Sequence, residues 1–266
     1  MSTTVHVLFV GDIVGKPGRR AFSEIYPRLK IRENIHFCVV NGENAAGGSG
    51  LNEKSVTGLL AGGADVLTSG DHIWRNKEVF SIIGAERRLL RPANFPPGTP
   101  GEGSGVFTTS SGLKIGVINL LGRVFMDPID CPFRQCTHEI DLISRQTNII
   151  VIDFHAEATS EKVAMGYYCD GRVSALIGTH THIPTADERI LKKGTAYITD
   201  IGMTGSSESV LGREIEPVLK RFVSGLPAYF NVSGDRPVLQ GVIVDIDTET
   251  GRATGIKRVN EPLVEG

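Results

Sequence analysis

The chain has 266 residues, of which 40% are hydrophobic and 22% are charged, and its formal net charge is -2. This length and composition can form a large buried core, either in one α/β domain or in two smaller ones. The lack of a basic excess argues against a duplex-binding face, so we expect no sequence-specific nucleic-acid partner.

Eight short runs rich in Val, Ile and Leu predict β-strands. Several carry apolar residues at successive positions, as strands buried on both faces do. In chain order the runs cover residues 5–10, 36–40, 64–69, 113–121, 148–154, 173–178, 195–199 and 241–246. Four segments with helical spacing lie between them, at residues 18–34, 52–63, 160–171 and 213–225. This alternation predicts an α/β fold in which helices cover a sheet.

Two further segments bear on domain organisation. Residues 91–105 are rich in Pro and Gly and are the best candidate for a linker. The strand pattern resumes immediately afterwards, so we interpret them as a long surface loop and the chain as one domain over residues 1–266. Residues 239–259 predict a hairpin that turns at 247–255, which would give the sheet an antiparallel end.

The cysteines and the first residues of the chain indicate the cellular compartment in which we expect the protein. The four cysteines, Cys38, Cys131, Cys136 and Cys169, form no CxxC pair, which suits reduced thiols. The chain enters an apolar run almost at once, without the pattern of a secretory leader. No apolar run reaches the roughly 20 residues that a membrane helix needs. We therefore expect a cytoplasmic protein with no membrane partner.

Side chains that can bind metals follow five of the predicted strands. In an open α/β sheet, residues just beyond the carboxyl ends of the strands converge on one crevice, where such folds bind ligands. These side chains should therefore lie close together. They are Asp12, Glu43, Asn44, Asp71, His72, His155, His180 and His182.

Each of these residues also has a simpler explanation. A Gly-Asp pair after a strand is usually a turn. The side chains of His180 and His182, two residues apart on extended backbone, would point to the same side of the strand, but this alone does not establish a metal site. We assign the other histidines, His6, His36 and His138, to the surface or to satisfied core positions. The combination still favours a metal site, because unrelated turns are not expected to place an oxygen or nitrogen ligand after so many strands.

The number of ligands indicates two ions. Three histidines, two or three acids and an amide exceed the four ligands of a structural zinc site, and mixed oxygen and nitrogen donors suit Fe, Mn or Zn better than Ca. Two cations about 3.5 to 4 Å apart are the usual arrangement for in-line hydrolysis at phosphorus, with one carboxylate between them.

Five motifs resemble one known family. "GDIVG", "NGENAAGG", "GDHIW", "FHAEATSEK" and "GTHTHIPTAD" are similar to motifs of the calcineurin-like metallophosphoesterases, in particular their YmdB-like branch, which acts on cyclic nucleotides. The resemblance runs nearly end to end. It implies a sandwich of two mixed β-sheets flanked by helices (αββα) and two metal ions, iron or manganese first, with zinc or magnesium as alternatives.

The resemblance also implies a role for each motif residue. Asp12, Asn44 and His182 would serve the first metal, with Asn44 also contacting the phosphate. Asp71, His155 and His180 would bind the second metal, and Glu43 would bridge the two. Adjacent side chains on extended backbone diverge, so His72 would face the substrate, where a protonated imidazole could donate to the leaving oxygen.

One position departs from the family pattern. The family has Asn where this chain has Asp71. The carboxylate can still coordinate through an oxygen, but it adds a negative charge beside the metals. We expect tighter cation binding, weaker attraction of an anionic phosphate, and retained activity with a shifted pH optimum.

The function implied is hydrolysis of 2′,3′-cyclic nucleotides, with 3′,5′-cyclic AMP as a further candidate, by a hydroxide bound between the metals and with His72 as proton donor. Arg123 would contact the phosphate or nucleotide, or would be a buried structural arginine.

The resemblance implies a homodimer or homotetramer. The sequence is less consistent with an amidohydrolase. The HxH motif of an amidohydrolase normally lies on its first strand, whereas here it is at His180 and His182 and Asp12 comes first. The alternative function is a weakly active or inactive metal-binding regulator that signals through partners.

Overall fold

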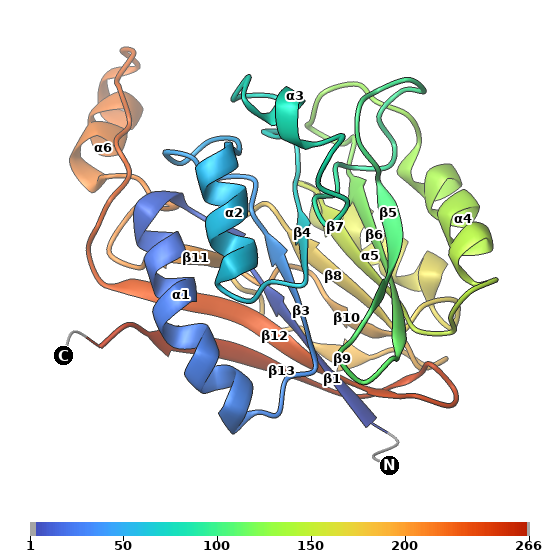
Figure 1. The fold of residues 1–266 in the computed structure, drawn as a ribbon. Coiled ribbons are helices and arrows are strands. Elements are labelled where there is room, and N and C mark those ends of the chain that lie inside the picture. The colour runs from blue at the N-terminus through green and yellow to red at the C-terminus, as the bar shows by residue number, and fades with distance from the viewer. Residues whose placement is uncertain (1–3, 265–266) are drawn as a thin grey trace.

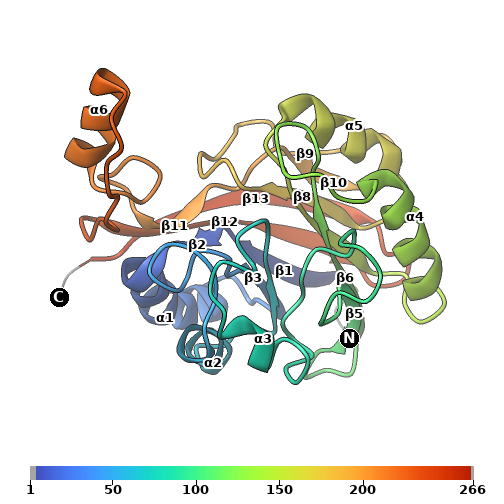
Figure 2. The same cartoon turned by 90° about the horizontal axis from the view of Figure 1, so that it is seen from above.

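The computed structural model describes residues 4–264, and it has two mixed β-sheets packed face to face between helices (Figures 1 and 2). The first sheet has the order β2-β11-β12-β1-β3-β4, with β13 paired to β12, and the second has the order β5-β6-β7-β8-β10-β9. This arrangement confirms the predicted αββα sandwich.

The strands of the first sheet are β1 (Thr4–Val10), β2 (Asp12–Ile13), β3 (Phe37–Asn41), β4 (Val66–Thr68), β11 (Met203–Ser206), β12 (Pro237–Asp247) and β13 (Ala253–Pro262). Those of the second are β5 (Ser104–Thr108), β6 (Lys114–Leu121), β7 (Ile150–His155), β8 (Ala175–Thr179), β9 (Arg189–Ile190) and β10 (Ala196–Ile198). The helices are α1 (Gly15–Arg32), α2 (Glu53–Ala61), α3 (Val79–Ile82), α4 (Pro132–Ile143), α5 (Thr159–Cys169) and α6 (Ile215–Ser224).

Alternate residues of each strand face different hydrophobic layers. Val5, Val7 and Phe9 of β1 belong to the layer between the two sheets, together with Val151 of β7. Leu8 of β1 faces the other way, into a layer shared with α1 and α2. The outer face of the second sheet packs in the same way against α4 and α5. Because strands buried on both faces need apolar residues at successive positions, the sandwich explains the continuous apolar runs of the sequence.

Most predicted elements are confirmed. Each of the eight predicted runs overlaps a strand, and the four predicted helical segments overlap α1, α2, α5 and α6. The antiparallel hairpin of β12 and β13 is also confirmed. Helix α4 was not predicted, although one of its faces is buried through Cys136, Ile140 and Ile143. The segment between Leu90 and β5 is irregular, as expected of a loop, but Ala93 and Asn94 within it are buried.

Parallel pairing determines where the carboxyl ends of the strands lie. Strands β1, β3 and β4 are parallel neighbours in the first sheet, and β6, β7, β8 and β10 are parallel neighbours in the second. Their carboxyl ends therefore meet at one edge of the sandwich, at the top of Figure 1. Within residues 4–264, none of the helices has the length and apolar character needed to cross a bilayer.

Candidate metal centre

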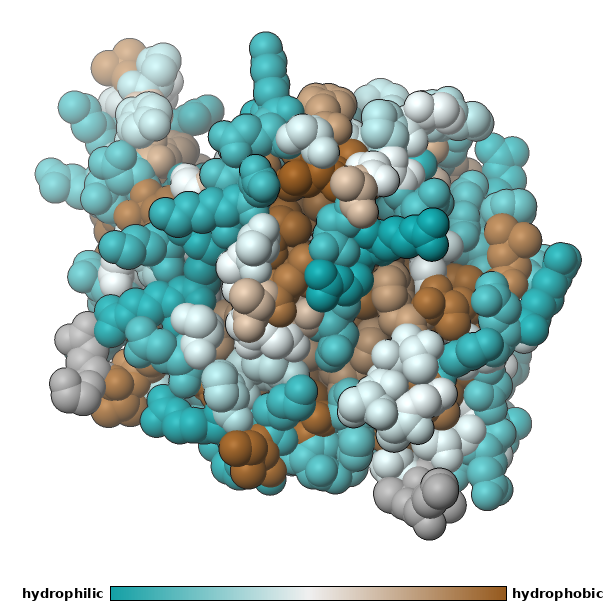
Figure 3. Space-filling model, viewed as in Figure 1, coloured by the Kyte–Doolittle hydropathy of each residue, from teal (hydrophilic) through white to brown (hydrophobic). Residues whose placement is uncertain are grey.

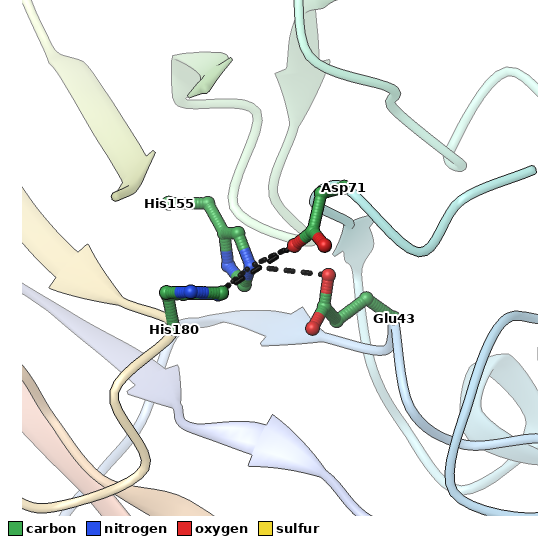
Figure 4. A group of neighbouring side chains, drawn as sticks. All are labelled: Glu43, Asp71, His155 and His180. Atoms are coloured by element: carbon green, nitrogen blue, oxygen red, sulfur yellow. Dashed lines mark hydrogen bonds and ion pairs between the residues drawn. The ribbon is translucent and has the colours of Figure 1, made fainter. Parts of the chain in front are cut away.

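Four of the predicted ligands form one tight group at this edge. Glu43 follows β3, Asp71 follows β4, His155 ends β7 and His180 follows β8. One ligand atom from each lies within 4.8 Å of the others. Figure 4 shows the two carboxylates and two imidazoles pointing toward one another, with His155 Nε2 3.1 Å from Glu43 Oε2 and 3.3 Å from Asp71 Oδ1.

Three other predicted residues form a second group beside the first. His182 Nε2 lies 3.7 Å from Asp12 Oδ2 and 3.3 Å from Asn44 Nδ2. Glu43 lies between the groups, because its Oε1 accepts a hydrogen bond of 2.8 Å from Asn44 Nδ2 while its Oε2 faces His155. With His72, which contacts Asn44, the structure brings together all eight predicted residues around one shared carboxylate.

The donor set fits metal ions. Asp12 is fully buried, yet its Oδ1 has no hydrogen-bond partner within the described residues. In that part of the chain the carboxylates of Asp12, Glu43 and Asp71 form ion pairs only with histidines, not with Lys or Arg. Buried carboxylates need a compensating positive charge. A cation held by mixed carboxylate and imidazole donors meets that requirement.

The electrostatics of the carboxylates reflect this crowding. Burial raises the pKa of Asp12 well above its usual range, and the neighbouring charge of Glu43 adds to the effect against the opposing charge of His155. Burial also acts to raise the pKa of Glu43, but the charge and hydrogen bond of His155 lower it to about 2. Glu43 is therefore the more readily ionised of the two, as a shared ligand needs to be.

The two histidines of the first group differ in their charge. Burial opposes the charged form of His155, but Glu43 and Asp71 raise its pKa well above the usual range. Burial and the charge of His155 lower the pKa of His180 to about 4. His180 is consequently neutral near pH 7, the form in which an imidazole can coordinate a metal.

The conformation around Asp71 and His72 differs from the prediction. Strand β4 ends at Thr68, and residues 71–74 form a turn rather than extended backbone. The two side chains therefore do not diverge: His72 Nε2 lies 3.4 Å from Asp71 Oδ2. His72 Nδ1 lies 2.8 Å from Asn44 Oδ1, so the amide orients the imidazole. In this orientation Asn44 presents its nitrogen, not its oxygen, to Glu43 and His182.

The loop after β8 also differs from the prediction. His180 and His182 have positive φ angles of 100° and 64°, so the backbone there is not extended. The two rings consequently enter different groups instead of chelating one point from the same side. Such φ angles are uncommon for residues other than Gly and concentrate at functional sites.

Some functional neighbours were not predicted. Glu157 Oε2 lies 3.2 Å from His180 Nε2, and buried Lys162 and Asp200 bind the backbone of the same loop. Glu157 and Lys162 both lie in "FHAEATSEK". The feature of the sequence that could have indicated them is a charged residue a few positions after the ligand His155. Arg123 was predicted to be a phosphate contact or a buried structural residue. The second alternative is wrong, because Arg123 is exposed, and only its backbone N–H is bonded to Glu161.

The chain is similar to known proteins over nearly its whole length. The model of the family described as "YmdB-like protein" matches residues 8–259. The chain is 50% identical over 255 residues to a 2′,3′-cyclic-nucleotide 2′-phosphodiesterase of Bacillus subtilis (strain 168), with 96% of each chain covered.

Two solved structures have the same fold. One is a hypothetical protein from Thermus thermophilus, with a TM-score of 0.89 and 39% identity, covering 97% of this chain and 99% of that one. The other is described as a novel phosphatase from Mycoplasma pneumoniae, with a TM-score of 0.92 and 34% identity, covering 98% and 95%.

Proposed function

Because the chain belongs to the YmdB-like family, we propose that it is a dimetal phosphodiesterase that hydrolyses cyclic nucleotides. Family membership and 50% identity to a phosphodiesterase make the chain a phosphoester hydrolase. The substrate we propose is a 2′,3′-cyclic nucleotide, with 3′,5′-cyclic AMP as a second candidate. Water adds to phosphorus while the bond from phosphorus to the ribose O2′ breaks, and the product is the 3′-phosphate.

The observation that carries the proposal is the pair of ligand groups joined by Glu43. Asp12 and His182 would hold one ion, with Asn44 beside it, and Asp71, His155 and His180 would hold the other. The approach of His182 Nε2 to Asp12 Oδ2, at 3.7 Å, supports the first assignment. The close approach of Glu43, Asp71, His155 and His180 supports the second. Iron and manganese are the ions we propose first, because both accept carboxylate and imidazole donors.

Bound ions would activate a water molecule and offset the charge of the phosphate. The chain's own residues supply orientation and the proton. Asn44 accepts a hydrogen bond from His72 Nδ1, which leaves Nε2 as the atom that carries the transferable proton. We propose that Nε2 donates this proton to the departing ribose O2′, so that no alkoxide is released.

A second candidate function, metal binding with little turnover, is favoured by one observation. Burial acts against ionisation of Asp71, but the hydrogen bond and charge of His155 hold its pKa below the usual range, so it is ionised near neutral pH. The charged carboxylate lies 3.4 Å from His72 Nε2, the proposed proton donor. A negative charge there repels an anionic substrate. The two functions differ in turnover, not in metal content.

The test is a hydrolysis assay with 2′,3′-cyclic AMP and with 3′,5′-cyclic AMP, using protein loaded in turn with Mn, Fe, Zn or Mg. We expect a 3′-phosphate product from the first substrate. Changing His72→Ala should lower kcat by roughly 10²- to 10⁴-fold, the usual contribution of a general acid, while metal content stays the same. The matched control is His138→Ala on α4. Metal binding without turnover under every ion would favour the regulatory alternative.

A further inference from the structure

A cavity joins the metal centre to a segment that the proposed mechanism does not use. The segment comprises residues 207–236, between β11 and β12, and we call it the α6 arm because it carries that helix. It projects from the body of the sandwich, at the upper left of Figures 1 and 2. The cavity has a volume of about 450 Å³, and its lining includes His72, His180 and His182 on one side and Phe222 and Phe230 on the other.

The α6 arm has an unusually apolar surface. Val218 is the only residue of α6 that is buried, whereas Phe222 is 81% exposed. Brown, hydrophobic atoms are visible over α6 at the upper left of Figure 3. Exposed apolar residues that gather next to a catalytic cavity indicate a surface that a ligand covers.

The two ends of the cavity have the chemistry of the two ends of a nucleotide. Glu43, His72 and the two loop histidines make one end polar and suited to a phosphate with metal ions. Leu211, Val218, Phe222 and Phe230 make the other end apolar and aromatic. The volume lies within the range of roughly 300–1,000 Å³ that is typical of pockets for small molecules. A flat nucleobase attached to a cyclic phosphate matches this division, since aromatic side chains stack on bases.

The polar groups of the α6 arm are not free to read the base. Arg213 is the one charged residue that the arm contributes to the cavity lining within residues 4–264. Its guanidinium is directed to backbone carbonyl oxygens, with Nη1 3.3 Å from that of Phe230 and Nη2 bonded to that of Gly48. The Arg221 guanidinium covers the Phe230 ring at 5.5 Å from its centroid, which leaves Phe222 as the more open ring.

We propose that the α6 arm is the nucleobase subsite, in which Phe222 stacks on the base and Phe230 forms the adjoining wall. This inference rests on the proposed function. It specifies recognition by stacking, without discrimination by the hydrogen-bonding edge of the base. All four 2′,3′-cyclic nucleotides should therefore be substrates, with lower KM for the larger purine rings.

The test compares a substrate that has a base with one that lacks it. KM and kcat are measured for 2′,3′-cyclic AMP and for glycerol 1,2-cyclic phosphate in the native chain, Phe222→Ala, Phe222→Trp and Val223→Ala. Val223 is 87% exposed on the same helix and does not line the cavity, so Val223→Ala is the matched control. Metal content is measured for every variant.

For Phe222→Ala we expect KM for the nucleotide, relative to that for glycerol 1,2-cyclic phosphate, to rise roughly 5- to 100-fold, the loss expected for one stacking contact. Phe222→Trp should restore the native ratio. An unchanged ratio, or an equal loss on both substrates, would overturn the subsite while leaving the proposed function intact. If the native chain hydrolyses neither substrate with any metal, the proposed function fails, and the subsite fails with it.

Discussion

Lys162 and Asp200 form a fully buried ion pair, 2.7 Å from Nζ to Oδ2, that holds both sides of His180. The same ammonium donates to the carbonyl oxygen of Thr179 at 2.7 Å, and the same carboxylate oxygen accepts from the backbone N–H of Thr181 at 3.0 Å. His180 has the uncommon φ of 100°. The ion pair therefore stabilises a backbone conformation that the residue would not adopt readily by itself.

Replacing Lys162 by Met should destabilise the fold and the metal centre together. Breaking a buried ion pair leaves an uncompensated charge and typically costs about 3–5 kcal/mol. We expect a loss of that size in the free energy of unfolding by urea, with less metal retained after dialysis. Lys54→Met, at an exposed position on α2, is the control and should change neither quantity. Equal stability of the two variants would show that the pair does not support the loop.

Gly70 has no side chain, and this allows His155 and Glu43 of the first ligand group to approach each other closely. A Cβ atom at this position would overlap the ring of His155 and the carboxylate of Glu43. Gly70→Ala should therefore displace one or both ligands and reduce the metal bound per chain to less than about half, since ligand positions must hold to within roughly 0.5 Å. Gly84→Ala is the control, because a Cβ there meets no atom within 4 Å. Full metal content in Gly70→Ala would mean that the group is less tightly packed than the structure indicates.

The sequence predicted the positions of ligands better than the backbone that carries them. Continuous apolar runs identify buried strands, and parallel strands bring their carboxyl ends to one edge, so residues such as Asp12 and His155 could be placed together. The turn at Asp71 and the positive φ angles of His180 and His182 could not be predicted, because tertiary contacts impose them.

Residues that support the ligands were harder to find. Lys162 and Asp200 are 38 positions apart, and nothing in their local sequence indicates that they pair. Glu157 is two residues from His155, yet it contacts His180, a ligand on a different strand end. Helix α4 is different, because Cys136, Ile140 and Ile143 have the spacing of one buried helix face and make the helix predictable from the sequence.

Glu157 should act on the metal through His180. Its Oε2 lies 3.2 Å from His180 Nε2, so the carboxylate can accept a hydrogen bond from Nε2–H. Nδ1 is then unprotonated on the side that faces His155 Nε2, 2.9 Å away, and Asp71 Oδ1, 3.5 Å away. Such carboxylate–histidine contacts fix the tautomer and the ring orientation. We expect Glu157→Gln to weaken metal affinity by roughly 10- to 100-fold in a competition titration with a chelator. Glu249→Gln in the β12–β13 turn is the control, and identical affinities would exclude this role.

The last prediction concerns the charge of Asp71. Burial acts to raise its pKa, but the hydrogen bond and charge of His155 hold it well below the usual range. A depressed carboxyl pKa means that the stabilisation by the ionised form is present at neutral pH and is lost only as pH falls toward the lowered pKa. Asp71 is therefore ionised near neutral pH.

Asp71→Asn removes that charge and keeps the shape. We expect weaker metal binding, a lower KM for the anionic nucleotide, and an acid limb of kcat/KM moved to lower pH, because a neighbouring negative charge favours the protonated form of every acid–base group near it. Asp127→Asn, at an exposed position, is the control. The measurements are a chelator titration and a pH profile over roughly pH 5 to 9, the range in which histidine and metal-bound water titrate. If both are the same as in the native chain, the metal ions already neutralise the additional charge, and Asp71 serves only as an oxygen ligand.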